Sequence, residues 1–190
     1  HQCDRRQRQM CIRDSIVANL LSKGKRVRAT VRDKNDPERV DHLKSMEIAD
    51  GGSIEIVEMD LFDEDSVDSA ISGCTDLIHT AATVIVRSRD PQRKIVDPSV
   101  IGTKNVISAV EKSGTIERFV HTSSTAAIRP MDWEDGAILT TESWANDATL
   151  ENNPYGLAKV SAEIIVRNWH SSLEVNNRPR LVTILSLIHI

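Results

Sequence analysis

"DPSVIGTKNVISAVEKSGTIERFVHTSS", residues Asp97 to Ser124, carries the clearest structural pattern in the chain. Its first part places apolar residues such as Val100 and Val106 at helical spacing, and Gly114 follows where such a helix would end. Its second part is an apolar run around Phe119 that ends in consecutive hydroxyl residues. The stretch therefore predicts a helix, a glycine stop, a short connection and a strand.

The same alternation continues in both directions along the chain. Strands are predicted around residues 27–31, 53–61, 76–82, 117–124 and 178–185, and helices around 16–24, 36–46, 63–73, 97–113 and 155–172. Helices and strands that alternate with short connections indicate a parallel sheet covered on both faces. The sequence thus predicts an α/β fold, a doubly wound parallel-sheet Rossmann domain.

Composition excludes several classes of protein. The chain has 190 residues, 39% of them hydrophobic, which is enough for one domain with a sizeable core. Its net charge of −4 argues against nucleic-acid binding, and no apolar run reaches the ~18 residues of a membrane span. Cys3, Cys11 and Cys74 lack CxxC spacing, and the histidines lie on different predicted elements. We therefore expect reduced thiols in a cytoplasmic protein, and no metal site.

One long stretch, Thr125 to Asn153, has no regular periodicity. It contains Trp133 and Trp144 together with turn-forming proline and glycine residues. Loops of this length in compact domains are usually functional or disordered. Ligands of open α/β sheets bind at the carboxyl ends of the strands, where this loop is expected to lie.

A tyrosine and a lysine open the helix that follows this loop. In "YGLAK", Tyr155 and Lys159 are four residues apart and therefore share one helix face. An ammonium beside a phenol lowers the phenol pKa, so the tyrosine can exchange a proton with a substrate oxygen near neutral pH. Such pairs also occur by chance, but Tyr155 is the only tyrosine in the chain.

The strand before the loop ends in hydroxyl residues, "FVHTSST". Either Ser123 or Ser124 could donate a hydrogen bond to the same substrate oxygen. Serine and threonine also terminate strands as ordinary turn residues. The Tyr–Lys pair on the following helix favours the functional interpretation.

Two strand ends carry candidate nucleotide-binding residues. Arg32 follows the strand at 27–31, and Arg39 lies on the next helix; a guanidinium there suits the 2′-phosphate of NADP. Asp33 beside it would suit NAD instead, and we expect NADP(H). In "MDL", Asp60 and its neighbour Leu61 end the next strand, where the carboxylate could bind adenine or merely cap a helix.

Several motifs together resemble one family. The stretches "IVANLLSKGKRVRATVRD", "GCTDLIHTAA", "GTKNVISAV", "RFVHTSS", "ESW" and "YGLAKVSAE" are similar to the extended short-chain dehydrogenase/reductase family, in its dihydroflavonol reductase-like and aldehyde/ketone reductase-like branch. The resemblance implies NADPH-dependent reduction of a small-molecule carbonyl substrate, and it also suggests a homodimer. It assigns the catalytic roles to Ser124 (or its neighbour Ser123), Tyr155 and Lys159. It assigns cofactor contacts to Arg32, Thr80, Ala81, Ala82, Tyr155 and Lys159.

Other functions on the same fold stay open at this point. A nucleotide-sugar epimerase/dehydratase or a 3β-hydroxysteroid dehydrogenase would share the Ser, Tyr and Lys residues. A non-catalytic NADP-sensing regulator is a third possibility. Arg32 and "ESW" favour the reductase, whereas intact Tyr155 and Lys159 argue against the sensor.

The two ends of the chain differ from the family pattern. No glycine precedes Gly24, so the glycine-rich turn that cradles pyrophosphate in the family is not matched. Arg5–Ser15 and Leu185–Ile190 can be encoded by opposite strands of one short DNA that resembles a transposase-type sequencing adapter. We therefore expect residues 1–15 and 185–190 to be non-native, and 16–184 to be a partial NADP-binding domain.

This interpretation has a structural consequence. The family's first strand is central in the sheet order 3-2-1-4-5-6. Without it, the strands around Val27 and Leu77 would lack a shared neighbour. The C-terminal substrate lobe would also be missing, so we expect the chain as written to bind NADPH poorly or not at all.

Overall fold

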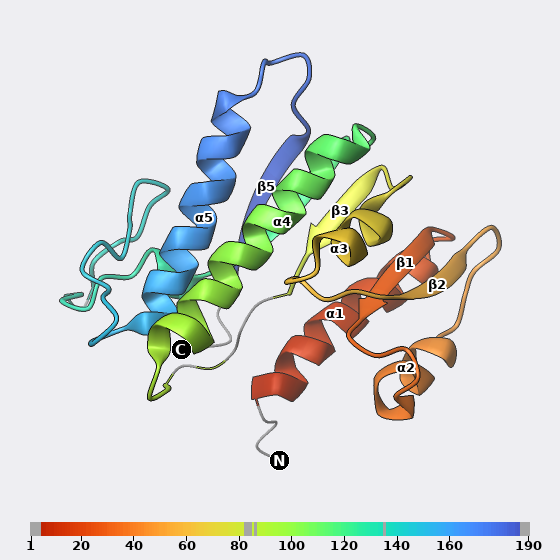
Figure 1. Ribbon diagram of the computed structural model, residues 1–190, viewed down its shortest axis with the longest axis horizontal. Helices are drawn as coiled ribbons and strands as arrows, with labels where there is room; N and C mark the ends of the chain where they lie inside the picture. The colour runs from red at the N-terminus through yellow and green to blue at the C-terminus, as the bar shows by residue number, and fades with distance from the viewer. Residues whose placement is uncertain (1–4, 82–84, 86, 135, 187–190) are drawn as a thin grey trace.

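The computed structural model of the protein describes residues 5–81, 85, 87–134 and 136–186, and it has a parallel α/β architecture (Figure 1). In chain order the elements are α1 (Arg5–Leu21), β1 (Arg26–Val31), α2 (Pro37–Lys44), β2 (Ser53–Glu58), α3 (Glu64–Ile71), β3 (Asp76–His79), the π-helical turn η1 (Gln92–Val96), α4 (Asp97–Ser113), β4 (Arg118–Ser124), the 3-10 turn η2 (Thr125–Ala127), α5 (Pro154–Ser172) and β5 (Arg180–Ser186). No described helix combines the length and the apolar character that crossing a membrane requires.

The strands form two parallel sheets. One contains β1 and β2, and the other has the order β3-β4-β5. Parallel pairing with helical crossovers confirms the predicted fold class. Within the described residues β1 and β3 do not pair with each other, so the sheet is interrupted between them. These are the two strands for which the sequence predicted an unfilled neighbour.

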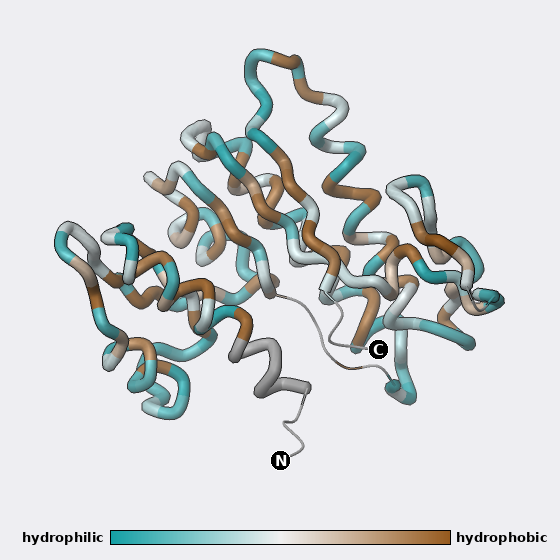
Figure 2. The backbone as a smooth tube through the Cα atoms, turned by 180° about the vertical axis from the view of Figure 1, so that it is seen from behind, coloured by the Kyte–Doolittle hydropathy of each residue, from teal (hydrophilic) through white to brown (hydrophobic). Residues whose placement is uncertain are grey.

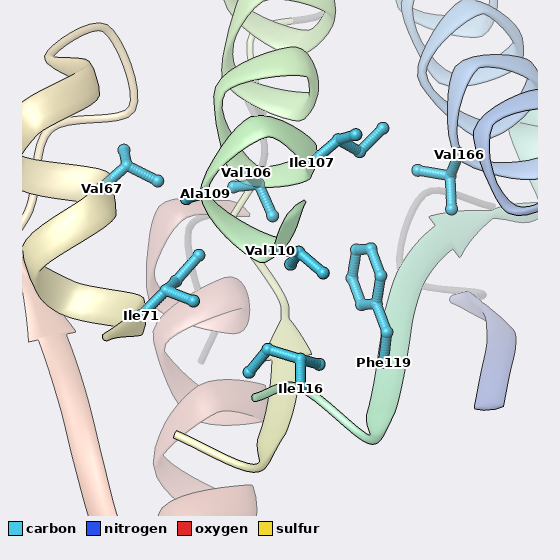
Figure 3. Close-up of a cluster of buried hydrophobic side chains, with 9 residues drawn as sticks. All are labelled: Val67, Ile71, Val106, Ile107, Ala109, Val110, Ile116, Phe119 and Val166. Carbon is cyan, nitrogen blue, oxygen red and sulfur yellow. The ribbon is translucent and has the colours of Figure 1, made fainter. Parts of the chain in front are cut away.

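The main core lies between the second sheet and three helices. Helices α3, α4 and α5 lie side by side over one face of β3, β4 and β5 (Figure 1). Phe119 on β4 is fully buried and meets the apolar faces of these helices (Figure 3). The cluster consists of Val67, Ile71, Val106, Ile107, Ala109, Val110, Ile116, Phe119 and Val166. This packing fixes α5, and hence the candidate catalytic pair, against the strand that ends in the serines.

The opposite face of the second sheet is more exposed. Val182 and Ile184 on β5 leave 53% and 52% of their surface accessible. Figure 2 shows the molecule from this side, with apolar segments along the strands. The three packed helices are thus all on the other face.

A smaller core belongs to the first sheet. Leu21 of α1 and Leu43 of α2 are fully buried against β1. Gly24 makes the turn from α1 to β1 with a φ of +67°, and a Cβ there would lie 2.6 Å from the Asp50 carbonyl oxygen. The predicted glycine stop is therefore required both by its backbone conformation and by close packing.

Side chains connect the two sheets across the interruption. Arg28 of β1 donates through Nη1 to the carbonyl oxygens of Ala70 (3.1 Å) and Ser72 (2.7 Å) at the end of α3. Asn105 of α4 donates to the Leu61 carbonyl oxygen at 2.8 Å. A cation at a helix C-terminus is also favoured by the helix dipole.

Two elements differ from the sequence prediction. Helix α1 begins at Arg5, whereas the apolar pattern predicted a start near Ile16. Residues 5–15 are rich in arginine and glutamine, with no glycine or proline, so nothing local stops the helix from extending. The π-helical turn η1 before α4 was not predicted, because its i→i+5 bonds do not follow the 3.6-residue periodicity.

Candidate active site

The start of α5 positions the tyrosine–lysine pair. Asn153 caps the helix by accepting a hydrogen bond from the Gly156 N–H at 2.8 Å, and Pro154 occupies the first turn. A Cβ at position 156 would lie 2.3 Å from Asn153 Nδ2 and would displace the cap. Helix α5 therefore starts immediately before Tyr155, which places Lys159 one turn further along the same face.

Tyr155 and Lys159 are brought together in a buried environment. They are 5% and 7% exposed, and the Lys159 Nζ lies 5.8 Å from the centroid of the Tyr155 ring. Tyr155 packs against Ile95 and Val96 of η1. Burial disfavours the ammonium and lowers the pKa of Lys159 to about 8, partly opposed by the charge of Glu163. The pair can thus hold a cation beside a phenol near neutral pH.

The structure separates the two candidate serines by their contacts. Ser123 donates through Oγ to Glu163 Oε2 at 2.5 Å, in a fully buried position. Ser124 points to the other side of β4, as successive strand residues do; its Oγ accepts from the Ala126 N–H at 3.2 Å and donates to the Ser186 carbonyl oxygen at 3.5 Å. Ala126 in turn packs against the cluster that contains Tyr155. Ser124 is therefore linked to the surroundings of the tyrosine, whereas Ser123 is engaged by Glu163.

Glu163 is a buried carboxylate that the sequence analysis missed. Its exposed fraction is 0%. Besides Ser123, it is bound by Arg167 through Nε and Nη2, at 3.0 and 2.7 Å from Oε1. The available signal was its spacing, since Glu163 follows Lys159 by four residues on α5 and must share its face.

Two stacked histidines also lie within electrostatic reach of Lys159. His79 and His121 are opposite each other on β3 and β4, with ring centroids 5.9 Å apart. Burial, together with the positive charge of Lys159, lowers the pKa of His79 to about 4 and that of His121 to about 3. Both imidazoles are neutral at pH 7. The sequence contains no sign of this pair, because the strand register that places the two histidines side by side is not visible in it.

The residues expected to bind the nucleotide lie at strand ends. Arg32 follows β1 and is exposed, whereas Arg39 forms an ion pair with the helix cap Asp36 at 2.7 Å. The Asp60 carboxylate accepts from the Phe62 N–H at 3.0 Å in the turn after β2, and Leu61 follows in that turn. The parallel register of β1 and β2 brings Arg32 and this turn to one sheet edge.

The last predicted cofactor segment follows β3. Thr80 and Ala81 directly succeed the buried His79 at the end of this strand. Ala82 lies outside the described residues. Thr80 therefore stands at the same sheet edge as Ser124, because β3 and β4 are parallel neighbours.

Comparisons with known proteins identify relatives of the chain. A sequence profile of the 3-beta hydroxysteroid dehydrogenase/isomerase family matches residues 12–185. Anthocyanidin reductase from Arabidopsis thaliana is 32% identical over 176 residues, covering 90% of this chain and 50% of that protein. Cinnamoyl-CoA reductase CAD2 from Medicago truncatula is 36% identical over 157 residues, covering 78% and 46%.

Solved structures show the same relationship. Gre2 from Candida albicans, crystallised in complex with NADPH, is 27% identical and superposes with a TM-score of 0.75, over 90% of this chain and 54% of that chain. The resemblance to reductases expected from the sequence is thereby confirmed. The chain spans about half the length of the curated relatives it matches.

Proposed function

Because the chain belongs to the 3-beta hydroxysteroid dehydrogenase/isomerase family, we propose that it is part of an NADPH-dependent oxidoreductase that reduces a carbonyl group to an alcohol. The observation that carries the proposal is the buried Tyr155–Lys159 pair at the start of α5. Similarity to anthocyanidin reductase and to cinnamoyl-CoA reductase supports reduction rather than another reaction of the fold.

The described residues fit the two ends of a dinucleotide. Arg32 presents an exposed guanidinium beyond β1, which suits a 2′-phosphate. Lys159 and Tyr155 suit the nicotinamide end, as does the segment after β3. The sequence has no glycine before Gly24, so the glycine-rich pyrophosphate turn of the family has no matching motif there. Tests of activity therefore belong in the longer protein to which we propose residues 16–184 belong.

In the proposed reaction, each residue has one task. NADPH, when bound, supplies the hydride to the carbonyl carbon. Tyr155 donates its phenolic proton to the oxygen, so that the C=O bond becomes CH–OH. The Lys159 ammonium makes the phenol a stronger acid, and the Ser124 hydroxyl donates a hydrogen bond that orients the carbonyl oxygen.

A second candidate is oxidation of a hydroxysteroid, since the matching family is described by that activity. The reaction would then run in reverse on the same residues, and Tyr155 would act as the base. NADPH oxidation with aldehydes and ketones, compared with NADP⁺ reduction by hydroxysteroids, separates the two directions.

The serine assignment gives the first test. In the longer protein, Ser124→Ala is expected to lower kcat for carbonyl reduction by about 10²-fold, as for the loss of one preorganised oxyanion donor. Ser123→Ala is the comparison variant and should lower kcat much less, because the Ser123 hydroxyl is bound to Glu163 and its loss affects the site only through that carboxylate. Steady-state NADPH oxidation measures both. A loss in the Ser123 variant as large as in the Ser124 variant would contradict the assignment.

Cofactor choice gives the second test. Arg32→Ala should raise KM for NADPH about tenfold or more, because one charge-assisted contact to phosphate is lost, and leave KM for NADH little changed. Arg26→Ala serves as the control, since Arg26 is an exposed arginine at the opposite end of β1. Equal effects of Arg32→Ala on both cofactors would argue against a role in 2′-phosphate recognition.

A further inference from the structure

We propose that Glu163 is a positioning residue of this site: its buried carboxylate links the end of β4 to the loop that contains Trp144, and its negative charge favours the Lys159 ammonium one helical turn away. The inference rests on the proposed function, because its readout is the activity of the tyrosine–lysine pair. Glu163 lies on α5 one turn after Lys159, on the same face of the helix.

Both oxygens of Glu163 are used by partners from different elements. Oε2 accepts the Ser123 hydroxyl of β4 at 2.5 Å, and Oε1 accepts two donors of the Arg167 guanidinium at 3.0 and 2.7 Å. A carboxylate that is 0% exposed needs such donors to remain ionised. The contact with Ser123 attaches α5 to β4 one residue before Ser124.

The charge of Glu163 acts on Lys159 across one helical turn. Within the described part of the chain, no carboxylate oxygen lies within 4.0 Å of the Lys159 Nζ, so the ammonium is buried without a direct ion pair. Glu163 raises the pKa of Lys159 against the opposing effect of burial. Lys159 in turn lowers the pKa of His79 and of His121, both of which are neutral above pH 6, and the Tyr155 ring centroid lies 5.8 Å from its Nζ.

The third partner of the arrangement is the long loop. The Arg167 guanidinium lies over the Trp144 ring, 5.0 Å from its centroid. Trp144 packs against the cluster of Ala127, Ala145 and Val160, which joins the loop to α5 and to η2. Glu163, through Arg167, therefore connects the end of β4 with the loop beside the site.

The test uses the pH dependence of kcat in the longer protein. We expect kcat of the wild-type enzyme to fall as the pH rises through about 8, where Lys159 loses its proton. This fall is the alkaline limb of the pH profile. Glu163→Gln keeps the shape and removes the charge, so the limb should move down by about one pH unit; kcat then falls about fivefold at pH 8 and little at pH 6. Glu163→Asp restores the charge and should bring the limb back toward pH 8.

A second variant should shift the alkaline limb in the opposite direction. Arg167→Gln removes a positive charge and keeps an amide donor for the Glu163 carboxylate, so the field on Lys159 becomes more negative and the fall in kcat should move to higher pH. The Arg167 side chain is 40% exposed, so this variant keeps the inference testable if Glu163→Gln does not fold. Glu111→Gln is the matched control, because Glu111 on α4 accepts the Trp169 Nε1–H at 2.9 Å on the exposed surface, away from Lys159.

The outcomes are distinguishable. An inactive wild-type enzyme overturns the proposed function itself. An active wild-type enzyme whose folded Glu163→Gln variant loses the same factor at every pH, or keeps its limb unmoved, overturns the inference alone. A limb that moves down in Glu163→Gln and up in Arg167→Gln supports it.

Discussion

Replacing Tyr155 with phenylalanine is expected to lower kcat for carbonyl reduction by about 10²- to 10⁴-fold, the usual contribution of a positioned general acid. The change removes one hydroxyl and keeps the ring that packs against Ile95 and Val96. KM for NADPH should change little, because Lys159 and Arg32 remain. Steady-state kinetics of the longer protein, with a panel of aldehydes and ketones, measures both constants.

The Tyr155→Phe variant tests one acid of this segment. Tyr155 is the only tyrosine of the 190 residues, so the variant removes the one phenol that the segment can offer as a proton donor. A Tyr155→Phe enzyme that retains wild-type kcat would remove the tyrosine from the mechanism and would favour a water or another acid in its place.

Acid is expected to destabilise the fold through the histidine pair. In the folded chain the pKa values are about 4 for His79 and about 3 for His121, below the ordinary value of 6.5. As the pH falls below 6.5, the two imidazoles bind protons in the unfolded chain but not in the folded chain. The free energy of unfolding therefore decreases until the pH reaches the folded pKa values. At 1.36 kcal/mol per pKa unit, each imidazole costs about 2 to 3 kcal/mol by pH 4.5.

Urea unfolding at pH 7.5 and pH 5 measures this loss. His121→Phe should remove a large part of it, because the ring is retained and the titration is lost. Within the described structure the Nδ1 of His121 has no hydrogen-bond partner, so the substitution breaks no bond there. His170→Gln is the control and should keep the acid sensitivity, since His170 lies beyond the pair and bonds to the Pro179 carbonyl oxygen. Equal stability of the wild-type chain at the two pH values would contradict the prediction.

The sequence predicted much of the fold because local signals and tertiary packing agree. Asp36 and Asp63 cap their helices, and Gly114 ends α4 with a φ of 60°, as their positions indicated. The irregular character of residues 125–153 was also predicted, apart from the short turn η2. The predicted start of α1 near Ile16 was wrong. Residues with good helix propensity extend the helix to Arg5, and they carry no apolar periodicity from which the extension could be predicted.

The site was predictable only where spacing along one element fixes the geometry. Tyr155 and Lys159 lie four apart on one helix, so their proximity follows from the sequence. Ser123 and Ser124 lie on opposite faces of β4, and the sequence does not reveal that Ser123 is the one bound to Glu163 of α5. The contacts of Glu163 and of the His79–His121 pair likewise depend on how α5, β3 and β4 pack together.

The interruption between β1 and β3 bears on how the chain loses its structure. The first sheet has its own apolar core with α1 and α2, while the second shares its core with α3, α4 and α5. Side chains such as Arg28, rather than a backbone ladder, join them within the described chain. Unfolding is then cooperative within each sheet and its helices but not between the two. Amide hydrogens of β1 and β2 can therefore exchange with solvent through a partial unfolding that leaves β4 protected.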